Sequence, residues 1–68
     1  MKQHKFLPEW GEYVSYTDAS TGYKYICTVT SKIYHDLWCV VEFVTVPPGF
    51  NNKVKKQVVL IENLSPVA

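Results

Sequence analysis

Short runs of alternating hydrophobic and polar residues dominate the chain, and this period of two is typical of β-strands. Residues 12–17 alternate, with Val14 and Tyr16 on one side and polar Ser15 on the other, so they predict a first strand. Residues 18–22 are rich in turn formers and end in a glycine, which can take the positive φ that a hairpin requires. The start of this pattern therefore predicts a β-hairpin.

The same alternation predicts a second strand over residues 23–31 and a third over residues 37–46, with a loop at residues 33–36 between them. The inward-facing side chains of the second strand are Tyr25, Cys27 and Val29. The inward-facing side chains of the third strand are Cys39, Val41 and Phe43. The third strand is the longest of these runs, and it also carries apolar side chains on its other face.

A fourth strand is predicted after an interruption. Residues 47–52 contain two consecutive prolines, a glycine and two asparagines, so they cannot continue a central strand and predict a loop. Residues 54–61 resume the strand pattern, but their last four residues are all apolar, and periodicity alone leaves the buried face open. We favour Val58 and Leu60 as the inward-facing residues.

The remaining segments complete an all-β fold with one domain. Residues 62–64 predict one short 3-10 turn, and residues 65–67 predict a final short strand. Residues 1–9 are mostly polar and predict an N-terminal arm, which leaves the domain to residues 10–68. No segment repeats its apolar residues with the 3.6-residue spacing of an α-helix.

Four short motifs follow one another in the order of the predicted strands. They are Gly11-x-x-Val14-x-Tyr16, Tyr23-x-Tyr25-x-x-x-Val29, Val41-x-Phe43 and the run from Val58 to Leu64-x-Pro66. With the turns between them, they resemble the SH3-like barrel of Tudor and related domains. The resemblance implies a small five-stranded barrel with one 3-10 turn before its last strand. The same barrel serves as RNA-binding modules, adapter subunits and a plasmid-borne dihydrofolate reductase, so the fold alone does not define the function.

Resemblance to Tudor domains implies an aromatic cage that holds methylated lysine or arginine by cation–π attraction. The positions that match such a cage are Tyr16, Tyr23, Phe43 and Phe50. The acidic residue and glycine that usually follow the third strand of these domains are replaced by Thr45, Val46, Pro47 and Pro48. The alternative is that the four aromatic side chains pack in the core and at its rim.

Composition supports a compact domain and argues against strong nucleic-acid binding. The chain has 68 residues, of which 47% are hydrophobic and 15% aromatic, enough apolar surface for one small core. Seven lysines and no arginine leave a net charge of +1, and arginine is the side chain best suited to bidentate phosphate recognition.

The two cysteines are expected to be buried thiols. A connection centred on Ile33 would place Cys27 directly opposite Cys39 and bring the two thiols into contact. Neither cysteine has the spacing of a metal site, so we expect no metal and no cofactor. The N-terminus lacks the apolar region of a signal peptide, and no apolar run is long enough to span a membrane, so a cytoplasmic protein without membrane contact is expected.

The outward face of the third strand provides the main functional hypothesis. An apolar strip is predicted there, formed by Trp38, Val40, Val44 and Val46. Exposed apolar strips usually mark interfaces, so the strip predicts homodimerisation or docking on a larger protein partner. The alternative is that the N-terminal arm covers the strip with Phe6, Leu7 and Trp10.

A lysine cluster provides the alternative function, a weak nucleic-acid-binding module. Its residues are Lys53, Lys55 and Lys56, joined by Lys32 and Tyr34 and by the stacking surface of Trp38. On a strand, Lys53 and Lys55 share one face and Lys56 points to the other. The competing interpretation is that the lysines protect a strand edge against aggregation.

Catalysis is not expected. His35 and Asp36 could form a general base beside Tyr34, but the sequence places no nucleophile with them, and a polar pair in a loop is usually solvated. The plasmid-type dihydrofolate reductase needs a strand resembling Val-Gln-Ile-Tyr, whereas residues 57–60 read Gln-Val-Val-Leu without the tyrosine. The sequence therefore favours a small adapter that binds protein over an enzyme.

Overall fold

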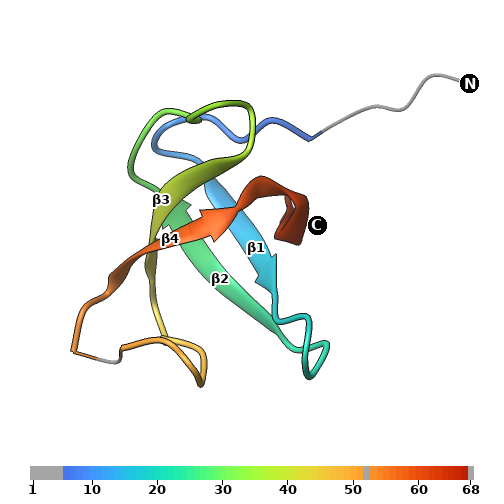
Figure 1. Ribbon diagram of the computed structural model, residues 1–68, viewed down its shortest axis with the longest axis vertical. Helices are drawn as coiled ribbons and strands as arrows, with labels where there is room; N and C mark the ends of the chain where they lie inside the picture. Colours follow the sequence, from blue (N-terminus) through green and yellow to red (C-terminus); the bar gives the residue numbers. More distant parts are fainter. Residues whose placement is uncertain (1–5, 52, 68) are drawn as a thin grey trace, which may run out of the picture.

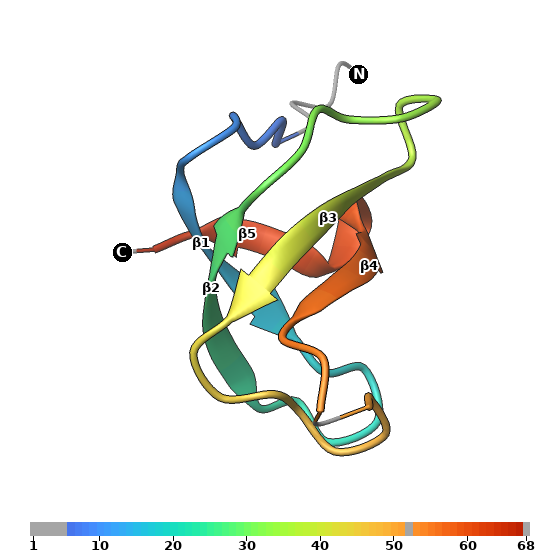
Figure 2. The ribbon, with the colours of Figure 1, turned by 90° about the vertical axis from the view of Figure 1, so that its left-hand side faces the viewer.

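The computed structural model describes residues 6–51 and 53–67, so residues 1–5 of the predicted arm, Asn52 and Ala68 lie outside the described residues. A single antiparallel sheet contains five strands in the order β4-β3-β2-β1-β5 (Figure 1 and Figure 2). The elements are β1 (Tyr13–Thr17), β2 (Lys24–Val29), β3 (Trp38–Phe43), β4 (Lys56–Leu60), the 3-10 turn η1 (Ile61–Asn63) and β5 (Leu64–Pro66). The predicted all-β class and the 3-10 turn before the last strand are confirmed. Within the described residues, no helix has the length and apolar character needed to cross a membrane.

The predicted hairpin of β1 and β2 is confirmed, and its turn is held by Asp18. The backbone N–H of Asp18 donates to the carbonyl of Tyr23 at 2.8 Å, and its own carbonyl accepts from Gly22 at 2.7 Å. Gly22 takes the expected positive φ of 80°. The Asp18 carboxylate accepts hydrogen bonds from the hydroxyl and backbone N–H of Ser20, and these bonds lower the pKa of Asp18.

The connection between β2 and β3 is centred on His35, two residues after Ile33, the centre that would pair Cys27 with Cys39. His35 and Asp36 both have positive φ, near 55°, and the flanking Tyr34 and Trp38 form a bridge across the turn. This turn places Cys27 opposite Phe43, so the expectation that Cys27 lies directly opposite Cys39 is wrong. Histidine and aspartate tolerate positive φ better than most residues, which explains how the chain turns there without glycine.

The buried face of β4 is the reverse of the one predicted. Val59 is 4% exposed, whereas Val58 is 58% and Leu60 39% exposed. The register explains this result, because Cys39 and Val41 of β3 are paired with Val59 and Gln57. Paired residues share a face, and the inward face of β3 is fixed by its own alternation.

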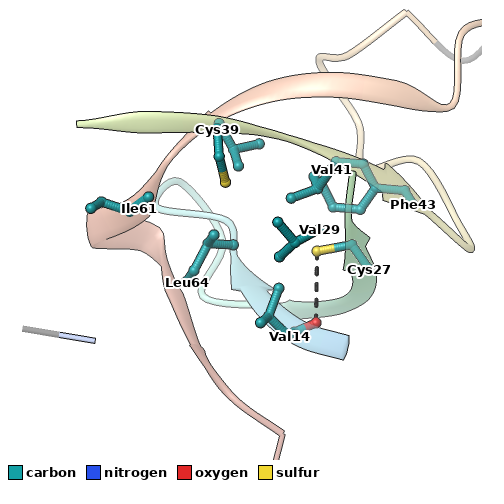
Figure 3. Close-up of a cluster of buried hydrophobic side chains, with 9 residues drawn as sticks. Val14, Cys27, Val29, Cys39, Val41, Phe43, Ile61 and Leu64 are labelled. Carbon is teal, nitrogen blue, oxygen red and sulfur yellow. Dashed lines mark hydrogen bonds between the residues drawn. The ribbon is translucent and has the colours of Figure 1, made fainter. Parts of the chain in front are cut away.

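The sheet curls so that β3 and β4 lie across β1 and β2 with the core between them (Figure 2). Figure 3 shows side chains from both halves meeting in this core. The core consists of Val14, Cys27, Val29, Cys39, Val41, Phe43, Val59, Ile61 and Leu64. Within the described residues, β4 and β5 remain the two edges of the sheet, linked through η1, and closure into the predicted barrel is not seen. The arrangement is compatible with an SH3-like fold.

The predicted burial of both thiols is confirmed. Cys27 and Cys39 are fully buried and free, and the Cys27 thiol lies 3.7 Å from the carbonyl oxygen of Val14, to which it donates (Figure 3). Burial raises the pKa of Cys27 to about 11, with a smaller contribution from the nearby Cys39. Burial also raises the pKa of Cys39. Both thiols are therefore neutral and weakly reactive near pH 7.

Valine-to-threonine substitutions at two neighbouring positions test the phase of β4. Val59→Thr places a hydroxyl in the core and should lower the free energy of unfolding by roughly 1–3 kcal/mol. Val58→Thr changes an exposed side chain and should cost less than about 0.5 kcal/mol. Urea unfolding at low micromolar protein concentration, followed by circular dichroism, measures both. Equal losses, or a larger loss at position 58, would contradict the register.

The buried thiols also predict a loss of stability in alkaline solution. Because folding raises the pKa of Cys27, its contribution is fully present below the unfolded pKa of 9.0 and is lost as the pH rises towards about 11. The free energy of unfolding should therefore fall between these pH values. Urea titrations at several pH values measure this, and Cys27→Ala provides the control, since the decrease should be smaller in that variant. An unchanged decrease would show that other groups cause it.

Candidate functional site

An apolar surface lies on the outward face of β3 and β4. The register pairs Trp38 with Leu60 and Val40 with Val58, and all four side chains point away from the core. Val58 and Leu60 are exposed, and Trp38 and Val40 are half-buried. Together with Tyr34, which contacts Trp38, we call these five residues the outer patch. The antiparallel pairing places these residues side by side although β3 and β4 are separated by a long loop.

Tyr34 joins the outer patch because of the tight turn between β2 and β3. Its backbone N–H donates to the carbonyl of Trp38 at 2.8 Å, and this bridge brings the two side chains together. The rings stack with centroids 4.4 Å apart and an interplanar angle of 19°. The Lys32 ammonium lies 5.1 Å from the centroid of the Tyr34 ring, within cation–π range. One end of the outer patch is thus aromatic and carries a positive charge.

The four residues of the predicted apolar strip do not form one continuous surface in the structure. Trp38 and Val40 belong to the outer patch, whereas Val46 is partly buried and packs against the core. The division arises because β3 ends at Phe43 and the chain then bends, which breaks the alternation on which the strip was predicted. Val44 is 71% exposed beyond the end of the strand, where it lines a shallow hollow of about 360 Å³. The other residues that line this hollow are Lys24, Tyr25, Ile26 and Thr45.

The described part of the N-terminal arm does not bury the outer patch. Phe6 packs against the core, but Leu7 and Trp10 are 54% and 72% exposed. Val58 and Leu60 also remain exposed with the arm in place. Among the described residues, the arm therefore leaves Val58 and Leu60 of the outer patch accessible to another molecule.

The lysines predicted to form one surface lie at different places. Lys53, Lys55 and Lys56 are all exposed, and Lys56 stands opposite Glu42 near the end of β3. Lys32 and Tyr34 lie beyond the other end of this strand, where Tyr34 contacts Trp38. Trp38 and Glu42 are four positions apart along the strand, which corresponds to roughly 13 Å. The register therefore sets the lysine cluster apart from the aromatic stack.

Three of the four residues predicted to form an aromatic cage contact one another. The ring centroids of Tyr16, Phe43 and Phe50 lie 5.5 to 5.8 Å apart, and Tyr16 meets both phenylalanines edge-on. Phe43 is only 1% exposed and offers almost no ring surface to a ligand. Burial, and to a lesser extent Asp18, raises the pKa of Tyr16. Tyr23 is 68% exposed beside the hairpin turn. These contacts favour the packing interpretation of the aromatic residues.

His35 and Asp36 have a conformational role in the tight turn between β2 and β3, where both are exposed. Within residues 6–51 and 53–67, no group of three metal-ligating side chains comes together.

Comparison with protein-family models, with curated proteins and with solved structures found no significant match.

The outer patch contains two residues that were expected in the core from the sequence, Val58 and Leu60. Only the register with β3 identifies them, because the apolar run to which they belong has no period.

Proposed function

We propose that the chain is a small non-catalytic adapter that binds a protein partner through the outer patch. The observation that carries this proposal is the cross-strand pairing of Trp38 with Leu60 and of Val40 with Val58, which joins two half-buried and two exposed apolar side chains into one surface. Contiguous apolar surface rimmed by polar residues is typical of protein interfaces. Tryptophan and tyrosine contribute strongly to binding energy because they bury large rings with few rotatable bonds.

The charges around the outer patch also favour a protein partner. Glu42 and Lys56 stand opposite each other at one end, and Lys32 lies at the other, so the rim carries both signs. A net charge of +1 for the whole chain gives little long-range attraction for a polyanion. The balance of charges supports short-range complementarity to a protein surface.

One observation supports weak nucleic-acid binding as a second candidate. Lys32 lies over Tyr34, and Tyr34 stacks on Trp38, so an ammonium group and aromatic rings occur together. Single-strand binders combine these features, with bases stacking on rings and lysines contacting phosphates. We favour a protein partner because Val40, Val58 and Leu60 make the rest of the surface apolar. Apolar side chains do not bind phosphate groups.

Trp38→Ala tests the proposed interface, and Trp10→Ala is the matched control because Trp10 is exposed outside the outer patch. Affinity capture from an extract of the source cells should recover a specific protein with the wild-type chain and with Trp10→Ala. Trp38→Ala should weaken this binding by at least about 2 kcal/mol, the loss typical of an interface hot spot. Circular dichroism checks that both variants are folded. Equal capture by Trp38→Ala would contradict the proposal.

Oligonucleotide binding separates the two candidate functions. Three lysines that each contact one phosphate contribute about −0.7 each, roughly −2 in total, to the slope of log affinity against log salt on single strands. We expect no tight binding at physiological salt, and no change when Lys53, Lys55 and Lys56 are all replaced by alanine. Fluorescence anisotropy with a labelled single strand over a range of salt concentrations measures this. Tight binding whose slope flattens in the triple variant would support the nucleic-acid function instead.

A further inference from the structure

The two edges of the sheet differ in how well they are protected. β5 has only three residues and ends in Pro66, which has no backbone N–H to offer a further strand. β4 has five residues without proline, and Val58 at its centre is 58% exposed. An edge strand with apolar side chains and free backbone groups is a template for pairing with another strand. β4 is therefore the edge at which the sheet can be extended.

The hydrogen bonds of β4 show which backbone groups are directed outwards. The N–H of Phe43 donates to the carbonyl of Lys55 at 3.0 Å, and the N–H of Ile61 donates to the carbonyl of Leu37 at 2.9 Å. Backbone groups alternate in direction along an antiparallel strand, so the odd-numbered residues of β4 face β3. The N–H and C=O groups of Lys56, Val58 and Leu60 consequently point to the free edge.

We propose that β4 pairs antiparallel with β4 of a second copy of this chain, about a two-fold axis through Val58. This inference rests on the proposed function and names a second copy as the partner at the β4 side of the outer patch. In the pairing, Val58 stands opposite Val58 of the other copy, and Lys56 stands opposite Leu60. The two Val58 residues exchange N–H···O=C bonds, and symmetry makes the contact self-complementary.

Charge complementarity favours this antiparallel register. Lys56 is the first residue of β4, Lys53 and Lys55 lie just before it, and Glu62 lies just beyond its end. Pairing about Val58 brings the basic end of each copy beside Glu62 of the other and separates the two lysine clusters. A parallel pairing would set the clusters side by side, where like charges repel. Within the described part of the chain, none of these four side chains has a salt-bridge partner in its own copy.

The pairing also enlarges the outer patch. Val40 and Val58 are cross-strand neighbours on the outward face, and the second copy continues the row with its own Val58 and Val40. The apolar surface of each copy thus becomes part of one surface that crosses the two-fold axis. A larger protein partner would then contact both copies, so the dimer completes the binding surface.

Val58→Pro and Val58→Lys test the pairing, because neither removes a hydrogen bond between β3 and β4. Proline removes the N–H at the two-fold axis, and lysine places two like charges opposite each other. Sedimentation equilibrium over a wide concentration range should show a dimer for the wild-type chain. Each variant should raise the dissociation constant roughly 10- to 100-fold, Val58→Pro because two hydrogen bonds are lost by symmetry and Val58→Lys because two like charges face each other.

Val44→Lys is the matched control, since Val44 is 71% exposed beyond the end of β3 and outside β4, and its substitution should leave the dimer intact. Circular dichroism checks that each variant is folded, and amide hydrogen exchange of the wild type should slow at Lys56, Val58 and Leu60 as concentration rises. A wild-type chain that remains monomeric up to about millimolar concentration would overturn the inference. So would a dimer that Val58→Pro and Val58→Lys leave unchanged.

The same variants distinguish failure of this inference from failure of the proposed function. A monomeric wild-type chain that captures a protein through Trp38 overturns the dimer and leaves the adapter function standing. A dimer disrupted only at Val58, in a chain whose protein capture does not depend on Trp38, supports the dimer and overturns the adapter function.

Discussion

The turn at His35 and Asp36 sets the register on which the rest of the sheet depends. Two successive residues with positive φ reverse the chain within the span from Tyr34 to Trp38, and the following strand can pair with β2 in only one way. A shift of one residue would move every side chain of β3 to the opposite face. Because β4 is paired with β3 alone, the turn also determines which residues of β4 are buried.

The same register creates both the core and the outer patch. On the inward side, Cys39 pairs with Val59, and the apolar core leaves the two thiols neutral and buried. On the outward side, the intervening residues Trp38 and Val40 meet apolar partners in β4. A strand that is apolar on both faces contributes to stability with one face and remains available for binding with the other.

The sequence predicts where the strands of this fold lie better than it predicts the register between neighbouring strands. The alternation around Val14, Cys27 and Val41 is clear, so the first three strands and their core-facing residues could be predicted, although Ser15 on the other face of β1 is also buried. The turn at His35 could not, because it contains neither glycine nor proline, and the phase of β4 could not, because its apolar run has no period. Both errors are errors of register, a property that depends on residues distant in sequence.

The residues of the candidate site were also only partly predictable from the sequence. Trp38 and Val40 could be assigned to an outward face from alternation alone, but Val46 could not be excluded without knowing that β3 ends at Phe43. Tyr34 was predicted only as part of a lysine surface, since its stacking on Trp38 depends on the turn. Residues within one strand could therefore be assigned from sequence, whereas contacts between strands required the structure.

Pairing with a second copy along β4 would also increase the stability of this small domain. A domain of 68 residues buries a smaller fraction of its surface than a longer one, so its core supplies limited stability. Edge pairing adds backbone hydrogen bonds and covers apolar side chains without any change to the fold of each copy. The exposed Val58 that weakens β4 as the edge of a monomer becomes the centre of the contact, and the unprotected edge is removed. The stability of the sheet and the formation of the binding surface would then depend on the same five residues of β4.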